Sequence, residues 1–112
     1  MTTTSALPQD KKLTVIFRVE PGCLGPTGAE LVDAFCDFAQ QKIMPLDAGF
    51  IHWQIVPRRD KSEAELQYRI NDKNLSHDQA SKYLTLFDKS LDIFEEHLND
   101  NLAIYIDEYL NH

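Results

Sequence analysis

The sequence has little of what most readily identifies an enzyme or a metalloprotein. It holds only two cysteines, Cys23 and Cys36, and they are thirteen positions apart, so no Cys-x-x-Cys pair supports thioredoxin-like chemistry. No two of the four histidines lie three or four positions apart, the spacing that pairs metal ligands on one helix face. No serine–histidine–acid pattern stands out either. We therefore expect no cofactor and no metal site.

Long apolar runs are also missing. No segment approaches the roughly 18 consecutive apolar residues of a membrane-spanning helix, and residues 1–10 are polar, without the basic start and apolar segment of a signal peptide. We expect a cytoplasmic protein with reduced thiols and no membrane partner. The length of 112 residues suits a single domain, which we place at residues 11–112 after a disordered tail at 1–10.

Positive charge is scarce, and the deficit lies almost wholly in the C-terminal third. The net charge is −7. Residues 1–75 carry ten acidic and nine basic side chains, whereas residues 76–112 carry eight acidic side chains and only two basic ones, Lys82 and Lys89. An acidic surface repels phosphate backbones, so we expect no nucleic-acid partner. A protein partner with a basic surface would fit the acidic third.

Apolar residues alternate in three segments and recur with helical spacing in the others. The alternation predicts strands at 13–19, 50–56 and 65–70, the last two joined as an antiparallel hairpin. Thr27 and Glu30 have the spacing of a capping box, which should begin a helix that ends before Pro45.

A second capping box, Ser76 with Gln79, predicts a helix of about five turns that extends to Leu98. Its apolar seam is Ala80, Leu84, Phe87, Leu91, Phe94 and Leu98. Asn99–Asn101 should interrupt it before a short final helix at 102–110, where alternation keeps a strand open as an alternative.

The element order is strand, helix, strand, strand, helix, helix. This order predicts an α+β fold with a three-stranded antiparallel or mixed sheet and helices packed on one face. The first crossover is long enough for the first strand to lie parallel to the second, or for the third to lie between them.

The loop before the first helix holds three of the four glycines. Backbone N–H groups at a helix start can bind an anion, and the same position favours a thiolate at Cys23. The loop thus supports a small-molecule or anion binder, or a thiol-dependent enzyme or redox sensor using Cys23. The candidate ligand residues are Gly22, Cys23, Gly25, Thr27 and Gly28. Neither the Walker A nor the dinucleotide spacing is present, so a rigid connector is the simpler interpretation.

The outward face of the predicted sheet offers a second candidate surface. Arg18, His52 and Arg69 should share it with Thr14, Gln54 and Gln67. We treat these three basic residues as candidate ligand contacts; the alternative is a polar sheet face that meets only solvent, which is the ordinary case. The face lacks the stacking aromatics of an RNA-binding sheet.

Leu86 and Ile93 lie one heptad apart, away from the apolar seam of the long helix, with Tyr83 and His97 beside them. A helix with one covered face has no need of these residues. Either the final helix folds back over them as a helical hairpin, or they pair with a second copy across a two-fold axis. We favour a small, non-catalytic binding or regulatory domain that self-associates as a homodimer through its C-terminal helices.

Overall fold

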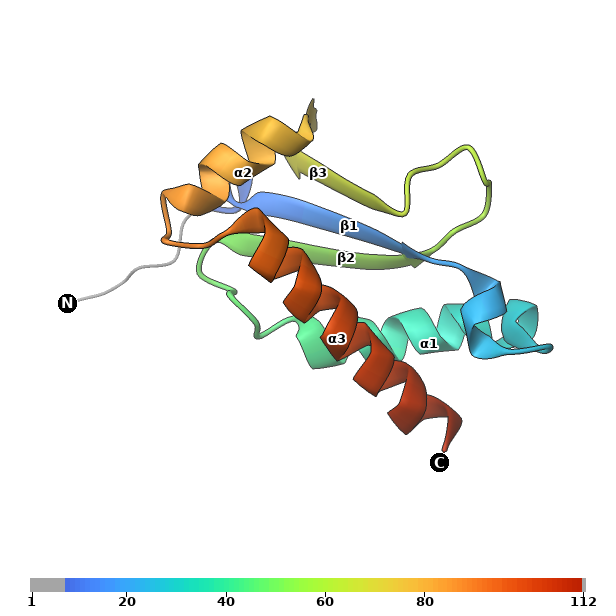
Figure 1. The fold of residues 1–112 in the computed structure, drawn as a ribbon. Helices are drawn as coiled ribbons and strands as arrows, with labels where there is room; N and C mark the ends of the chain where they lie inside the picture. Colours follow the sequence, from blue (N-terminus) through green and yellow to red (C-terminus); the bar gives the residue numbers. More distant parts are fainter. Residues whose placement is uncertain (1–7, 112) are drawn as a thin grey trace.

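The computed structural model describes residues 8–111 and contains three helices and an open, four-stranded mixed sheet (Figure 1). In chain order the elements are β1 (Leu13–Val19), α1 (Gly28–Ile43), β2 (Ile51–Pro57), β3 (Leu66–Ile70), β4 (Lys73–Leu75), α2 (His77–Thr85) and α3 (Leu91–Leu110). The predicted α+β class is confirmed. Of the predicted disordered tail, residues 1–7 lie outside the described residues, and Gln9–Lys11 form a short 3-10 helix.

The strand order is β2-β1-β3-β4, with β1 parallel to β2 and antiparallel to β3. The predicted hairpin between the second and third strands is therefore wrong, because β1 lies between them. Strand β1 is the most apolar of the three: even Ile16, on the face away from the helices, is only 4% exposed. A strand with a buried apolar residue on its outward face as well belongs at the centre of a sheet, between two neighbours, whereas the polar loop 58–65 can cross over its end.

The fourth strand, β4, was missed at the sequence level. It pairs with β3 through a two-residue turn at Asn71 and Asp72, whose φ angles are 47° and 67°. A two-residue hairpin turn of this kind needs positive φ at both positions, and asparagine and aspartate tolerate that conformation better than most residues. The Asn-Asp pair between Ile70 and Lys73 was the sequence signal for this strand.

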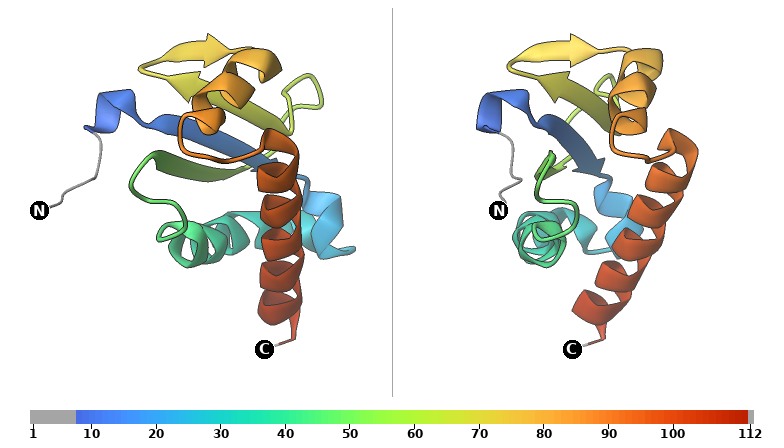
Figure 2. Two further views of the ribbon diagram at one scale, coloured as in Figure 1. Left: turned by 60° about the vertical axis from the view of Figure 1, so that its left-hand side comes forward. Right: turned by 90° about the vertical axis from the view of Figure 1, so that its left-hand side faces the viewer.

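The hydrophobic core lies between one face of the sheet and the three helices. Strand residues on that face include Val15, Trp53 and Tyr68, and they meet Phe35 of α1 and Leu98 of α3. Figure 2 shows α1 nearly end-on beside β2, with α2 and α3 along one side of the sheet. The inward faces predicted for the first two strands are confirmed by the burial of Val15, Ile51 and Trp53.

The outer edge of β2 is closed by a side chain of α1. The Gln40 amide donates to the carbonyl of Trp53 at 2.8 Å, and its oxygen accepts from the N–H of Ile55 at 2.8 Å. An open edge would leave these backbone groups free to pair with another chain. Gln40 therefore fixes α1 against the sheet and blocks this edge.

The predicted five-turn helix is interrupted earlier than expected. Helix α2 ends at Thr85, and Asp88 takes the left-handed conformation with φ 58°. The N–H of Lys89 donates to the carbonyl of Leu84 at 3.0 Å, and that of Asp88 to Thr85 at 3.1 Å. These two bonds form a Schellman motif, which satisfies the last carbonyls of the helix and turns the chain. Five of the six predicted seam residues are nevertheless buried, and Phe87 is partly buried; the five are Ala80, Leu84, Leu91, Phe94 and Leu98.

The predicted break at Asn99–Asn101 is wrong, since α3 runs through it as one helix of twenty residues. Asparagine and aspartate each cost only about 0.5–0.7 kcal/mol in a helix relative to alanine. The flanking Leu98 and Leu102 are both buried, and their burial outweighs that cost. Residues 102–110 are accordingly helical, so the strand alternative is also wrong.

The two predicted capping boxes fare differently. Ser76 and Gln79 form theirs, with each side chain accepting a bond from the other's backbone N–H. Thr27 does precede α1, but its ψ of 18° is not extended and its side chain makes no capping bond. The N–H of Glu30 donates instead to the backbone carbonyl of Thr27 at 3.0 Å. A capping side chain requires extended backbone at the first position, which the glycine-rich loop does not provide here.

Candidate functional site

The loop before α1 is closed by its own hydrogen bonds. The N–H groups of Cys23, Gly25 and Gly28 donate to carbonyls three residues earlier, at 2.9–3.2 Å. Gly25 has φ 94°, and a Cβ on Gly28 would lie 1.8 Å from the carbonyl oxygen of Pro21. The backbone itself needs Gly25 and Gly28, and three of the N–H donors that an anion could use, those of Cys23, Gly25 and Gly28, are already occupied.

Cys23 is exposed and borders a small hollow of about 210 Å³, together with Phe17, Leu102 and Ile106. No histidine lines this hollow, so the described residues place no imidazole base beside the thiol. Cys36 is buried in the core, and its burial, followed by the nearby carboxylates of Asp33 and Asp37, raises its pKa to about 12. That thiol is therefore unreactive in the folded protein.

The open face of the sheet holds the predicted polar residues, as the register shows. His52, Thr14 and Arg69 lie in one row across β2, β1 and β3. Arg69 and Thr14 border a hollow of about 290 Å³, which the acidic Asp10 and Asp72 share. These carboxylates counteract the attraction of Arg69 for an anion.

Arg18, further along β1, is engaged by the loop between β2 and β3. Its guanidinium donates to the Ala64 carbonyl at 2.7 Å and to the Gln67 side chain at 2.8 Å, and lies 3.6 Å from the Glu63 carboxylate. Arg58 likewise donates to the carbonyls of Lys61 and Glu63. These arginines hold the loop in place, so the predicted ligand contact at Arg18 already has protein partners.

The proposed ligand residues do not converge on one site. The row with His52 and Arg69 crosses the start of β1, whereas the Gly22–Gly28 loop follows its end. From Thr14 to Val19 the strand spans about 17 Å, at about 3.3 Å per residue. The sequence pattern identified both groups, but only the strand direction shows that they lie at opposite ends.

The predicted interface residues divide between two elements. Leu86 is 78% exposed in the turn after α2, and Ile93 is 55% exposed on α3. The final segment extends α3 rather than folding back, so the helical hairpin that was one of the two covers expected for them does not form. Tyr83 faces inward: its hydroxyl donates to the backbone carbonyls of Lys11 and Phe50 at 3.0–3.1 Å. Leu86 and Ile93 thus remain uncovered in the single chain.

Ile93 and His97 line a groove of about 570 Å³ between α3 and the segment that leads from α1 to β2. The rings of Trp53 and Phe94 form its floor, stacked with 5.6 Å between centroids and 10° between planes. Leu46 forms the opposite wall and is held there by its carbonyl, which accepts from the Trp53 indole at 2.8 Å. The groove is therefore apolar at its base and open to solvent.

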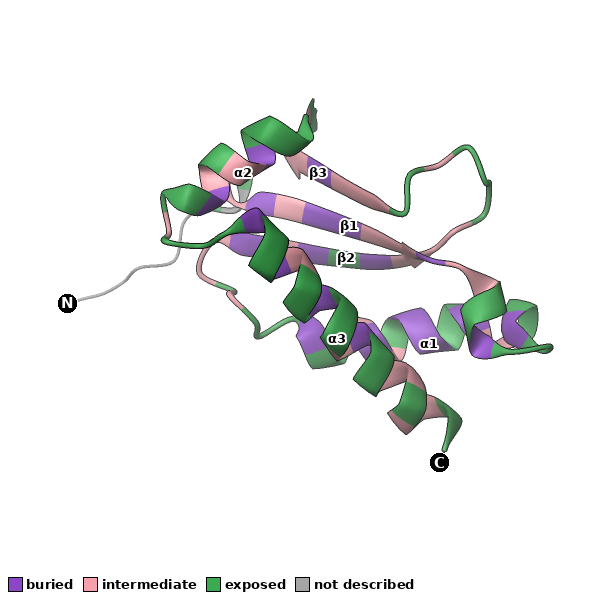
Figure 3. Cartoon of the chain, viewed as in Figure 1, coloured by how far each residue is buried: buried purple, intermediate pink, exposed green. Residues whose placement is uncertain are grey.

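The charge around this groove is negative. Asp47, Asp88 and Asp100 lie on its rim, and its one lysine, Lys89, is 3.8 Å from the Asp47 carboxylate. Beside it, α3 carries an exposed row at four-residue spacing, Asp92, Glu96 and Asp100, which lie on one helix face. Figure 3 shows the outward side of α3 as largely exposed. Four of the eight acidic residues of the C-terminal third thus lie at or beside an apolar groove, namely Asp88, Asp92, Glu96 and Asp100.

Leu46 and Trp53 were not recognised as site residues. Trp53 follows the alternation of a core strand, and nothing local distinguishes the floor of a groove from a covered core position. The one available signal was Met44 and Leu46 around Pro45, two apolar residues in a connecting loop where polar ones are usual. Both are exposed in the structure.

Comparison of the chain with models of known protein families, with curated proteins and with solved structures finds no match. Between residues 8 and 111 no group of three or more histidine, cysteine, aspartate or glutamate side chains could hold a metal ion. None of the helices in that range is both long and apolar enough to cross a membrane.

Proposed function

We propose that this protein is a non-catalytic binding domain, and that the groove beside Ile93 takes an amphipathic helix with a basic polar face from a protein partner. The observation that carries the proposal is the exposure of Ile93 above an aromatic floor, within an acidic rim. An apolar groove that receives the apolar face of a helix is a common way for proteins to bind peptides. Opposite charge around it adds specificity and speeds association.

The choice between a basic partner and a second copy depends on charge. Two copies that met through this side of α3 would bring Asp92, Glu96 and Asp100 close to the same residues of the other copy. Like charges facing each other across an interface oppose association. A basic helix removes this repulsion and covers the same apolar surface, so it fits better than the homodimer expected from the sequence.

The test uses a synthetic helix of leucine and lysine, with the leucines on one face. Trp53 is the only tryptophan and lies at the floor of the groove, so its fluorescence reports occupancy directly. We expect saturable binding that weakens as salt is added. Ile93→Ser should lower the affinity at least tenfold. Ile104→Ser is the matched control, because Ile104 is 54% exposed on the same helix but outside the groove, and it should change little.

Three results would refute the proposal. The first is no binding of the lysine peptide, and the second is equal binding of a peptide with glutamate in place of lysine. The third concerns the second copy and is measured by light scattering. If the wild type is a dimer and Leu86→Asp combined with Ile93→Asp is a monomer, then the groove is filled by the protein itself.

A further inference from the structure

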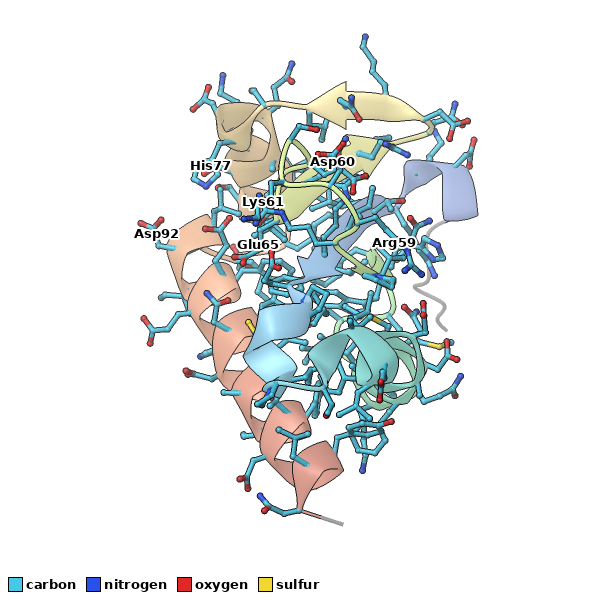
Figure 4. The ribbon with its side chains drawn as sticks, turned by 90° about the vertical axis from the view of Figure 1, so that its right-hand side faces the viewer. Arg59, Asp60, Lys61, Glu65, His77 and Asp92 are labelled. Carbon is cyan, nitrogen blue, oxygen red and sulfur yellow. The ribbon has the colours of Figure 1, made fainter. Side chains whose placement is uncertain are left out.

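A second hollow lies on the other flank of α3, where a glutamate is held by side chains from two other elements. Tyr68 of β3 donates its hydroxyl to Oε2 of Glu95 at 2.6 Å, and Nε2 of His77 in α2 lies 3.3 Å from the same oxygen. The three side chains border a hollow of about 440 Å³. Figure 4 views the molecule from the side of the loop between β2 and β3, and it shows His77 on α2 near the start of α3.

The Glu95 side chain is only 26% exposed, whereas Asp92, Glu96, Asp100 and Asp107 of the same helix are exposed. Its Oε2 is fixed by Tyr68, while Oε1 accepts no hydrogen bond from residue 8 or residues 10–111, whose side chains the structure describes. No lysine or arginine in this range lies within ion-pair distance of it, although Arg18, Arg58, Arg59, Lys82 and Lys89 all have acidic partners. Among the residues in this range, His77 alone can pair with Glu95 as a cation, and only when its imidazole is protonated. Beside a neutral His77 the partly buried carboxylate has no counter-charge, and a bound cation would relieve this cost.

The walls of the hollow limit what that cation can be. Ala64, Leu66 and Leu75 line it with apolar side chains, and its other polar lining residue, Gln67, is bonded to Arg18 and Asn74. A metal ion would need at least three protein ligands, and only Glu95 and His77 are in reach. Burial, followed by the hydrogen bond to Glu95, raises the pKa of Tyr68, so the phenol stays protonated and remains a donor.

We propose that this hollow binds a primary ammonium group on a short aliphatic stem, the ammonium pairing with Oε1 of Glu95 and the stem lying against Leu66 and Leu75. A free alkylamine and a lysine side chain share this chemistry. The site is separate from the groove beside Ile93 and does not depend on the function proposed for that groove.

The test is a titration with n-butylammonium chloride at about pH 8, above the range in which histidine ordinarily titrates, followed by backbone amide NMR. We expect saturable shifts confined to residues 64–68, 75–77 and 94–96, with a dissociation constant on the order of millimolar for so small a ligand. n-Butanol, the uncharged analogue, should produce none of them. Titration with Nα-acetyl-lysine amide separates the two sources of the ammonium group. If it binds as tightly as butylammonium, the ligand of the hollow is a lysine side chain. If butylammonium binds and Nα-acetyl-lysine amide does not, the ligand is a free alkylamine.

Matched variants identify the carboxylate responsible. Glu95→Gln keeps an oxygen that can accept from Tyr68 but removes the charge, and it should weaken butylammonium binding at least tenfold. Glu96→Gln makes the same change of charge on an exposed neighbour and should leave binding within about twofold. Equal loss in both variants would mean attraction to the acidic helix in general, and would overturn the proposal.

A second pair of variants changes only exposed positions of the loop between β2 and β3. Ala64 is exposed at the mouth of the hollow, so Ala64→Lys supplies a tethered ammonium that should block the added ligand. Ser62→Lys, exposed in the same loop but outside the hollow, should not. Absence of localised shifts in the wild type, or unchanged binding in Ala64→Lys, would refute the site.

Discussion

The two long helices, α1 and α3, pack on the same face of the sheet but differ in the apolar side chains they leave exposed. In α1 the apolar residues lie on the buried side, and Gln40 bonds the helix to the edge of β2. In α3 the buried side is equally apolar, yet Ile93, Ile104 and Leu110 are exposed among acidic residues. Helix α1 therefore completes its contacts within the chain, whereas the outer side of α3 has none and is available for a partner.

The largest expected difference in the free energy of unfolding is between two alanine variants, one with a large side chain removed from α1 and one with a large side chain removed from α3. Phe35→Ala in α1 removes a fully buried ring and should lower the free energy of unfolding by about 3–5 kcal/mol. Ile93→Ala in α3 should change it by less than about 0.5 kcal/mol, because the side chain is mostly in solvent. Urea unfolding followed by Trp53 fluorescence measures both.

Helices α1 and α3 would not differ in this way if Ile93→Ala destabilised the protein as strongly as a core substitution. Such a result, especially one that depends on protein concentration, would mean that Ile93 is already covered in solution by another copy.

A smaller effect tests how α1 is fixed to the sheet. Gln40→Ala leaves the Trp53 carbonyl and the Ile55 N–H of β2 without their side-chain partner, which should cost about 1–3 kcal/mol. Gln41→Ala, at the exposed next position, is the control and should stay within about 0.5 kcal/mol of the wild type. If the two variants are equally stable, the Gln40 bonds do not contribute to the attachment of α1.

The smallest effect concerns the middle of α3. Because Asn99 is exposed within a continuous helix, Asn99→Ala should raise the free energy of unfolding by about 0.5 kcal/mol through helix propensity alone. Thermal and urea unfolding can resolve a gain of this size. No gain, or a loss, would favour the helix break that the Asn-Asp-Asn run suggests.

Local signals in the sequence predicted the structure correctly where tertiary packing favours the same conformation as the local residues. The alternation at 13–19, the Ser76–Gln79 capping box and the stop at Pro45 all correspond to elements of the structure. In each case the residues that decide the conformation are within a few positions of one another. Leu86 and Ile93 do lie off the seam, but the helical hairpin that the sequence offered as one cover for them does not form, and both are exposed.

The errors came where distant contacts outweigh local preference. Asn99–Asn101 is a weak helix former, but the burial of Leu98 and Leu102 keeps α3 continuous. Asp88 interrupts the preceding helix instead, and its left-handed conformation is stabilised by the bond from Lys89 to Leu84. Propensity sets a preference of tenths of a kcal/mol, and tertiary packing can exceed it several-fold.

By itself the sequence determined the α+β class, the faces of the first two strands and the acidity of the C-terminal third, because periodicity and composition depend only on which residues follow one another. Tertiary structure alone decided that β1 separates β2 from β3, that Trp53 forms the floor of a groove and that Glu95 meets Tyr68 and His77. Those outcomes join residues 18 to 41 positions apart, or the strands that carry them, and no local pattern encodes which distant side chains will meet.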